Sequence, residues 1–236
     1  MKKNKIKQLR ELFSQFNIDG YIIPKNDAYF SEFSSPDRLK FISNFSGSAG
    51  QALILKKKNY LIIDGRYTIQ AEFESGKDFK ICEVPKFSFY QVFKKNKKKL
   101  LIGYDPQLFT SSYLKKNLNS FFKLIPIEKN LVDLISKKPK LNTVNPFYNL
   151  KKKFVGESVY SKIKRLSKEL KKSKIDNIFI SAPENVAWLL NLRGMDNPNS
   201  PIPNSKLFLT RNKKIYFFSC PKKIYKMKKV KEYKNI

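Results

Sequence analysis

The chain has 236 residues, which is enough for one large domain or two small ones, and 41% of these residues are hydrophobic. It carries a formal net charge of +30 but no histidine, which excludes Ser-His-Asp triads, HExxH zinc sites and other chemistry that depends on an imidazole. Cys82 and Cys220 lie far apart in the sequence, so neither a disulfide framework nor a cysteine zinc site is expected.

The N-terminal residues predict an amphipathic helix over 5–16, with Ile6, Leu9, Leu12 and Phe13 on one side. This stretch has no continuous apolar core of the kind that a signal peptide requires. No apolar run approaches the roughly 18 residues that cross a bilayer. We therefore expect a cytoplasmic protein without a membrane partner.

The first half of the chain alternates strand-like and helix-like segments, which predicts a layered α/β domain with a mixed sheet over residues 1–136. A hairpin is expected where two apolar runs flank Lys56–Asn59. The predicted strands are 21–23, 51–55, 60–64, 79–84, 100–104 and 122–127, and the predicted helices are 36–42, 67–74, 88–95 and 111–119.

Residues 137–155 are rich in proline, asparagine and lysine and show no periodicity, so we expect a linker there. A second domain of similar fold is predicted over 156–236, incomplete at its C-terminal end. Its order of helix, strand, helix and hairpin matches that of residues 5–64, which indicates a repeat of fold. The predicted elements are helices 158–173 and 182–190, a polar turn over 191–196, and strands 175–181, 207–210 and 215–219.

The high positive charge invites a nucleic-acid-binding interpretation, because phosphate neutralisation drives most nonspecific affinity. Of the 49 basic residues, however, six are arginine, whereas specific readers of phosphates and bases favour the planar guanidinium. The lysine excess is typical of the amino-acid drift of an AT-rich genome. Nucleic acid is therefore not the expected partner, although it stays a third alternative.

Few residues suggest chemistry. The turn Gly47–Gly50 lacks the GxxxxGK[ST] pattern of a phosphate-binding loop and precedes a strand, which favours close packing over phosphate binding. The carboxylates of Asp27, Asp37 and Asp64 are available for acid–base work in principle, but capping and turn formation explain them as well.

Arg66 is unusual because it follows a predicted strand and a glycine, at the start of a helix. The positive end of a helix dipole disfavours a cation there. Two explanations remain open from the residues alone. One is a structural ion pair with Asp64 or Glu72, and the other is contact with a ligand, since strand ends and loops often carry function.

Several motifs follow one another along residues 5–220 in the order and spacing of one protein family. They are Asp27 with Ser31-Glu32, Pro36–Arg38, Phe41–Phe45, Gly47–Gly50, Asp64–Tyr67, Gly156–Ser158, Ala187–Asp196 and Pro201–Pro203. In these motifs the chain resembles the X-prolyl aminopeptidases, proline-specific metallopeptidases with creatinase-like N-terminal domains. The longer, three-domain type of aminopeptidase P is the branch that it resembles most.

The resemblance implies two creatinase-like domains ahead of a catalytic third domain, which binds two manganese or zinc ions and activates water. This chain lacks histidine and that third domain, so no catalytic residue and no metal ligand is expected in it. By resemblance, Arg66 contacts the bound peptide, and Asp64, Arg193 and Asp196 support the site.

Two functions of different classes follow. In the first, the chain is the non-catalytic N-terminal region of an Xaa-Pro aminopeptidase, inactive alone, which contributes substrate contact and assembly. Proline-containing peptides are then its partners, and the full-length family implies a homodimer. In the second, it is a stand-alone creatinase-like module that binds peptides or a partner without hydrolysis.

Overall fold

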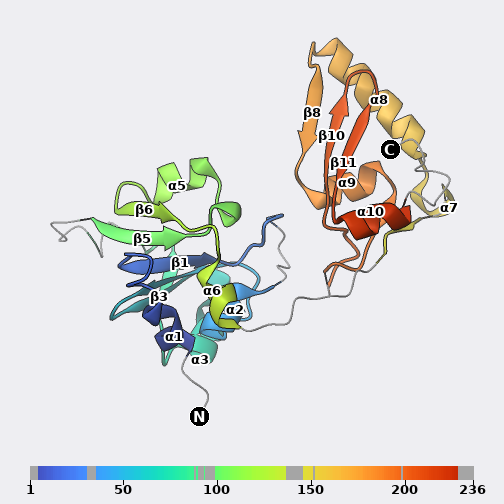
Figure 1. Cartoon of the computed structure of the whole chain (residues 1–236). Coiled ribbons are helices and arrows are strands. Elements are labelled where there is room, and N and C mark those ends of the chain that lie inside the picture. The colour runs from blue at the N-terminus through green and yellow to red at the C-terminus, as the bar shows by residue number, and fades with distance from the viewer. Residues whose placement is uncertain are drawn as a thin grey trace. The chain divides into compact units, whose positions relative to one another are not determined.

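The computed structural model describes residues 5–30, 36–87, 89, 93, 99–136, 146–150, 152–197 and 199–227. The chain divides into two compact units, Met1–Pro139 and Lys140–Ile236, which are drawn in Figure 1. Each unit has its own hydrophobic core, and the two are described separately below.

The first unit contains a six-stranded sheet in the order β4-β3-β2-β1-β5-β6. Strand β2 pairs antiparallel with both β1 and β3, whereas β4 pairs with β3, β5 with β1 and β6 with β5 in parallel. The mixed sheet confirms the predicted α/β class. The strands are β1 (Gly20–Pro24), β2 (Gln51–Leu55), β3 (Asn59–Asp64), β4 (Lys80–Val84), β5 (Leu100–Tyr104) and β6 (Phe122–Pro126).

Helices cover both faces of this sheet. Figure 1 shows α1, α2, α3 and α6 on one side and α5 on the other. Alternation along a strand therefore sends Tyr21 and Ile23 into one core and Ile22 into the other, and all of β1 is buried. The helices are α1 (Lys5–Glu11), α2 (Arg38–Ser43), α3 (Thr68–Ser75), α5 (Ser111–Asn117) and α6 (Leu131–Ser136).

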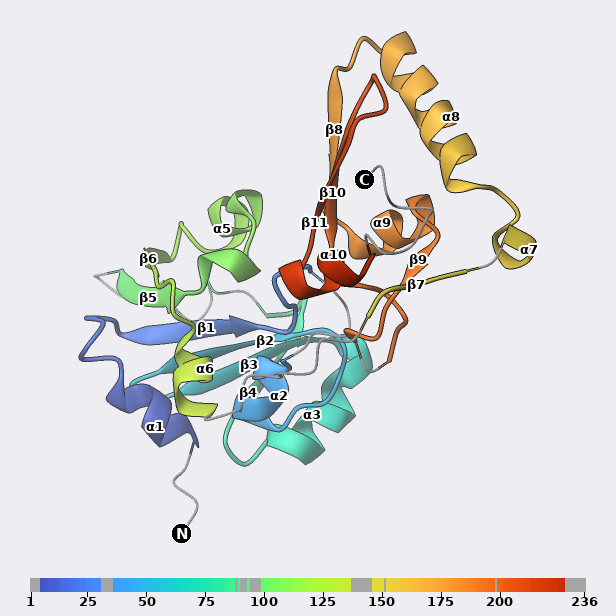
Figure 2. The same cartoon turned by 45° about the vertical axis from the view of Figure 1, so that its right-hand side comes forward.

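The second unit has an antiparallel three-stranded sheet in the order β11-β10-β8 and a small two-stranded sheet of β7 and β9. Helices α8 and α9 lie on the same side of the three-stranded sheet (Figure 2). The elements are β7 (Tyr148–Asn149), α7 (Lys152–Val155), α8 (Val159–Lys172), β8 (Asn177–Ile180), α9 (Pro183–Leu189), β9 (Leu192–Arg193), β10 (Lys206–Thr210), β11 (Ile215–Phe218) and α10 (Pro221–Met227).

The two units repeat one arrangement, as the sequence predicts. In both, the chain runs through a helix, a strand, a second helix and a hairpin. The strand and the hairpin form a three-stranded antiparallel sheet, ordered β3-β2-β1 in one unit and β11-β10-β8 in the other. They differ on the sheet face that points away from the paired helices. In the second unit, Phe179 and Tyr216 lie opposite Phe208 on this face, and Phe179 is 56% exposed. We call Phe179, Phe208 and Tyr216 the open aromatic row.

Some predicted elements need correction. The N-terminal helix ends at Glu11, and turns occupy residues 12–17. The predicted polar turn over 191–196 contains strand β9, and the predicted linker over 137–155 contains β7 and α7. Strands β7 and β9 are only two residues long and pair through Tyr148 with Arg193 and Asn149 with Leu192, far apart in the sequence, so local composition does not reveal them. Residues 137–145 of that linker, and most of the predicted helix 88–95, lie outside the described residues.

Candidate functional site

Strand β3 ends at Asp64, whose carboxylate begins the short 3₁₀ helix Gly65–Tyr67 by accepting a hydrogen bond from the Arg66 backbone N–H at 2.8 Å. The guanidinium of Arg66 folds back onto the same carboxylate, with Nε 3.0 Å from Oδ1 and Nη2 2.8 Å from Oδ2. Hydrogen bonds from Arg66 lower the pKa of Asp64, which is therefore ionised at neutral pH. The ion pair that the sequence suggests between these residues is present.

The same ion pair leaves the Arg66 side chain 72% exposed. Its guanidinium lies 5.3 Å from the centre of the Tyr67 ring, which adds a cation–π contact. A cation at the start of a helix turn is thus compensated locally by one carboxylate and one aromatic ring. The arrangement holds an oriented, solvent-accessible guanidinium at the end of β3.

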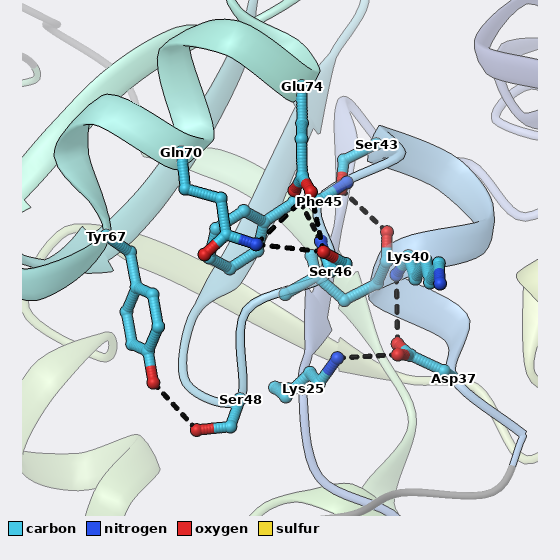
Figure 3. A network of polar contacts seen from close by, with 11 residues as sticks. Lys25, Asp37, Lys40, Ser43, Phe45, Ser46, Ser48, Tyr67, Gln70 and Glu74 are labelled. Carbon is cyan, nitrogen blue, oxygen red and sulfur yellow. Dashed lines mark hydrogen bonds and ion pairs between the residues drawn. The ribbon is translucent and has the colours of Figure 1, made fainter.

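Tyr67 connects this turn to the glycine-rich loop that precedes β2. Figure 3 shows its hydroxyl next to Ser48, at an oxygen–oxygen distance of 2.8 Å. A β-carbon at Gly47 would lie 2.3 Å from the ring of Phe45, so only glycine fits there. This contact supports the interpretation of Gly47–Gly50 as a packing turn rather than a phosphate-binding loop.

Helix α3 fixes the start of the same loop. The Glu74 carboxylate accepts hydrogen bonds from the backbone N–H and the hydroxyl of Ser46 at 2.7 and 2.6 Å (Figure 3). Gln70 donates to the Ser46 hydroxyl at 2.8 Å and to Glu74 at 3.2 Å. Burial acts to raise the pKa of Glu74, but the hydrogen bonds from Ser46 and Gln70 outweigh it, and the pKa falls below its usual value.

Asp27 and Asp37 have structural partners. Asp27 is buried and accepts from the backbone N–H of Tyr29 at 2.9 Å, as in a turn. Asp37 caps α2 through the N–H of Lys40, also at 2.9 Å, and forms an ion pair with the buried Lys25 (Figure 3). These contacts are those expected from the capping and turn explanation.

A pocket of about 560 Å³ lies beside the Arg66 turn, where the strands of the first unit end. Pro24 of β1, Asp64 of β3 and Val84 of β4 line it from the sheet, and Phe109 and Tyr113 line it from the segment after β5. The sequence did not single out Phe109 or Tyr113. The available signal was their position just after a strand, since ligands of α/β folds bind beyond the carboxyl ends of strands.

The other two predicted site residues lie in the second unit. Arg193 donates through Nη1 to the carbonyls of Ala187 and Leu192, at 3.2 and 2.8 Å. Asp196 forms an ion pair with Lys223 and accepts from the backbone N–H of Asn204 at 2.7 Å. The structure thus brings Asp64 and Arg66 together in one unit, and ties Arg193 and Asp196 to different partners in the other.

The two sequence motifs of the second unit meet around Lys162. Its ammonium is buried and donates to the carbonyl of Trp188 at 2.6 Å and to Oδ1 of Asn191 at 2.7 Å. Asn191 in turn donates to the carbonyl of Glu157 at 3.0 Å. Burial lowers the pKa of Lys162. Gly156–Ser158 and the segment that starts at Ala187 are therefore joined by hydrogen bonds that stabilise this unit.

The residues that the structure describes do not fit a metal centre. The chain has no histidine, and the described residues contain no group of three or more carboxylates or thiols placed to hold an ion. Over the same described part of the chain, no helix is long and apolar enough to cross a membrane.

Two family models match the chain. Both describe the creatinase/prolidase N-terminal domain, one over residues 5–135 and the other over residues 137–235. Among curated proteins, the chain is 34% identical over 223 residues to a probable Xaa-Pro aminopeptidase P of Coprinopsis cinerea, covering 89% of this chain and 36% of the relative. It is 36% identical over 213 residues to the probable Xaa-Pro aminopeptidase P of Pyricularia oryzae, covering 84% of this chain and 34% of the relative.

The solved structures that resemble this chain include one that covers nearly all of it. It is the X-prolyl aminopeptidase of Caenorhabditis elegans, a cytosolic enzyme with a di-nuclear active site, which covers 93% of this chain with a TM-score of 0.81 and 28% identity. This chain covers 39% of that structure, and it spans 34–36% of the length of the two fungal relatives.

Proposed function

We propose a function from the premise that this chain belongs to the creatinase/prolidase N-terminal domain family, of which it carries two members in succession. The chain is the non-catalytic N-terminal region of an Xaa-Pro aminopeptidase, which removes the residue before a proline at a peptide N-terminus. The observation that carries this proposal is the similarity to the C. elegans enzyme across 93% of the chain.

In this proposal the two units supply substrate contact and assembly, and Arg66 supplies the contact. Its guanidinium is exposed and held in one orientation by Asp64, which suits a directed hydrogen bond to a peptide oxygen. Arg193 and Asp196 support the second unit. In this proposal, hydrolysis depends on two manganese or zinc ions bound outside this sequence, since the sequence has no histidine and its described residues contain no group of three or more carboxylates or thiols placed to hold an ion.

A cytoplasmic location and a homodimeric assembly belong to the same proposal. The C. elegans relative is described as cytosolic, which supports the location. The homodimer rests on the family resemblance, and light scattering on the complete gene product tests it.

Activity assays test the function directly. Purified 1–236 is expected to release no N-terminal residue from Ala-Pro peptides, with or without manganese or zinc. Turnover that a chelator abolishes would overturn the non-catalytic assignment. Sequencing the gene past codon 236 distinguishes the aminopeptidase proposal from the stand-alone binding module. A downstream reading frame with two Asp, one His and two Glu at metal-site spacing supports the aminopeptidase. A genuine stop codon at that point favours a stand-alone binding module.

A further inference from the structure

We propose that the pocket of the first unit binds an apolar side chain of a peptide, while Arg66 at its edge holds a neighbouring peptide oxygen. This inference rests on the proposed function and deepens it, since it assigns a specificity site next to the substrate contact.

The position and size of the pocket suit a ligand. It opens where β1, β3 and β4 end, the side of an α/β sheet at which ligands bind. Its volume of about 560 Å³ lies within the range of roughly 300–1,000 Å³ typical of small-molecule sites. An amino-acid side chain with its flanking peptide groups fits a space of this size.

The walls favour an apolar occupant. Ile62, Val84, Leu108 and Phe109 supply carbon surface, and the rings of Phe109 and Tyr113 lie 5.8 Å apart. The Tyr113 hydroxyl donates to Oε1 of Gln51 at 3.0 Å, which places its polar end on a wall residue. Burial raises the pKa of Tyr113, so its phenol stays uncharged. A charged side chain would lose its hydration against this carbon surface, and the one carboxylate in the lining, that of Asp64, is already paired with Arg66.

The charged groups lie at the edge instead. Asp64 lines the pocket and holds the Arg66 guanidinium 2.8 Å from its Oδ2. The guanidinium is exposed and fixed in plane, so an oxygen of a bound peptide reaches it from solvent. A peptide presents what this arrangement requires, an apolar side chain within a few ångströms of a carbonyl oxygen.

The pocket lining also includes a strained aromatic residue. Phe30 lines the pocket, is 52% exposed and adopts a φ of 58°, in the left-handed region that bulky side chains disfavour. Such strain is typical of ligand sites. The loop that contributes Ala49 and Gly50 to the pocket is in turn held by the hydrogen bond between Ser48 and Tyr67. The lining thus includes an exposed aromatic side chain and a loop that a hydrogen bond holds in place.

Peptide titration of the ¹⁵N-labelled chain tests the proposal. The probes are the peptides Ala-Pro-Phe-Ala and Ala-Pro-Ala-Ala. Their binding is measured from the amide chemical shifts of Gly50, Gln51 and Tyr113. We expect the phenylalanine peptide to bind at least about tenfold more tightly than the alanine peptide, because its ring is removed from water in the pocket. Val84→Trp fills the pocket and should abolish this preference, and Phe30→Ala should reduce it. Ile69→Trp and Phe73→Ala, which change exposed residues of α3, are the matched controls and should bind both peptides as the wild type does.

The outcomes separate the pocket from the proposed function. Equal binding of the two peptides, no shifts at the pocket amides, or a preference that survives both Val84→Trp and Phe30→Ala overturns the pocket assignment. Arg66→Ala should weaken the binding of both peptides by a similar factor and leave the preference for the phenylalanine peptide unchanged. If Arg66→Ala changes neither affinity while the phenylalanine preference persists, the pocket stands and the substrate contact in the proposed function is wrong.

Discussion

The guanidinium of Arg66 donates two hydrogen bonds along one edge to the carboxylate of Asp64, from Nε to Oδ1 at 3.0 Å and from Nη2 to Oδ2 at 2.8 Å. Two contacts to one planar group fix its orientation, which a single contact to an ammonium does not do. The two-contact geometry at this position requires arginine, although lysine supplies most of the positive charges of this chain.

Arg66→Lys should impair catalysis without unfolding the chain. In the protein that joins this chain to a catalytic domain, we expect kcat/KM for Xaa-Pro peptides to fall about ten- to a hundredfold, the effect of one lost charge-assisted hydrogen bond. The melting temperature should hardly change, because the side chain is mostly exposed. Arg165→Lys is the matched control, since Arg165 is an exposed arginine paired with one carboxylate. A lowered melting temperature with normal kinetics would retire the substrate role.

Glu74→Gln should make stability less dependent on pH. The pKa of Glu74 is lowered in the folded chain, so its carboxylate stabilises the fold above the unfolded pKa of about 4.3. That contribution is lost as the pH falls through the lower, folded pKa. We expect the variant to melt below the wild type at pH 7 and the difference to shrink as the pH falls from about 5 toward 3. Glu72→Gln changes the same charge on the same helix, and an equal pH-dependent difference there would contradict the assignment.

Lys162→Met should destabilise the second unit. The substitution keeps the apolar stem but removes the buried ammonium that donates to the carbonyl of Trp188 and to the amide oxygen of Asn191. We expect a loss of about 1–3 kcal/mol in the free energy of unfolding. Trp188 is the only tryptophan in the sequence, so its fluorescence in urea reports this unit directly. Lys164→Met, on the exposed side of α8, should have little effect; equal losses would refute the role of Lys162.

The two units should differ when each is produced alone. Residues 1–139 have a sheet covered on both faces and should unfold in one cooperative transition. Residues 140–236 carry the open aromatic row, and should be less stable and bind more of a hydrophobic dye per molecule. Phe179→Ser should lower dye binding, whereas Tyr160→Ser on α8 should not. Equal stability and equal dye binding of the two units would contradict this prediction.

The strands and the Arg66 turn could be predicted because their signals are local. Strand β3 is an apolar run that ends at Asp64, and the ion pair joins residues two positions apart. Helix α6 was missed because it has only six residues, too few to show a period. Strand β9 was missed because its partner β7 lies far away in the sequence.

The pocket could not be predicted for the same reason. Its walls combine Pro24 with Phe109 and Tyr113, which come together through the parallel pairing of β1 with β5. Parallel neighbours need a crossover connection, and β1 and β5 are separated by residues 25–99, which include β2, β3 and β4. Periodicity identifies each strand but does not say which strands become neighbours.

Leu53 and Phe208 hold the same place in the two repeats, on the middle strand and on the face turned away from the paired helices. Leu53 is fully buried in the second core of its unit, whereas Phe208 belongs to the open aromatic row. If a tandem gene duplication produced the repeats, the copies have since evolved under different constraints. A substitution at position 53 alters the packing of a closed core, whereas one at position 208 alters an open sheet face and so the solubility of the unit.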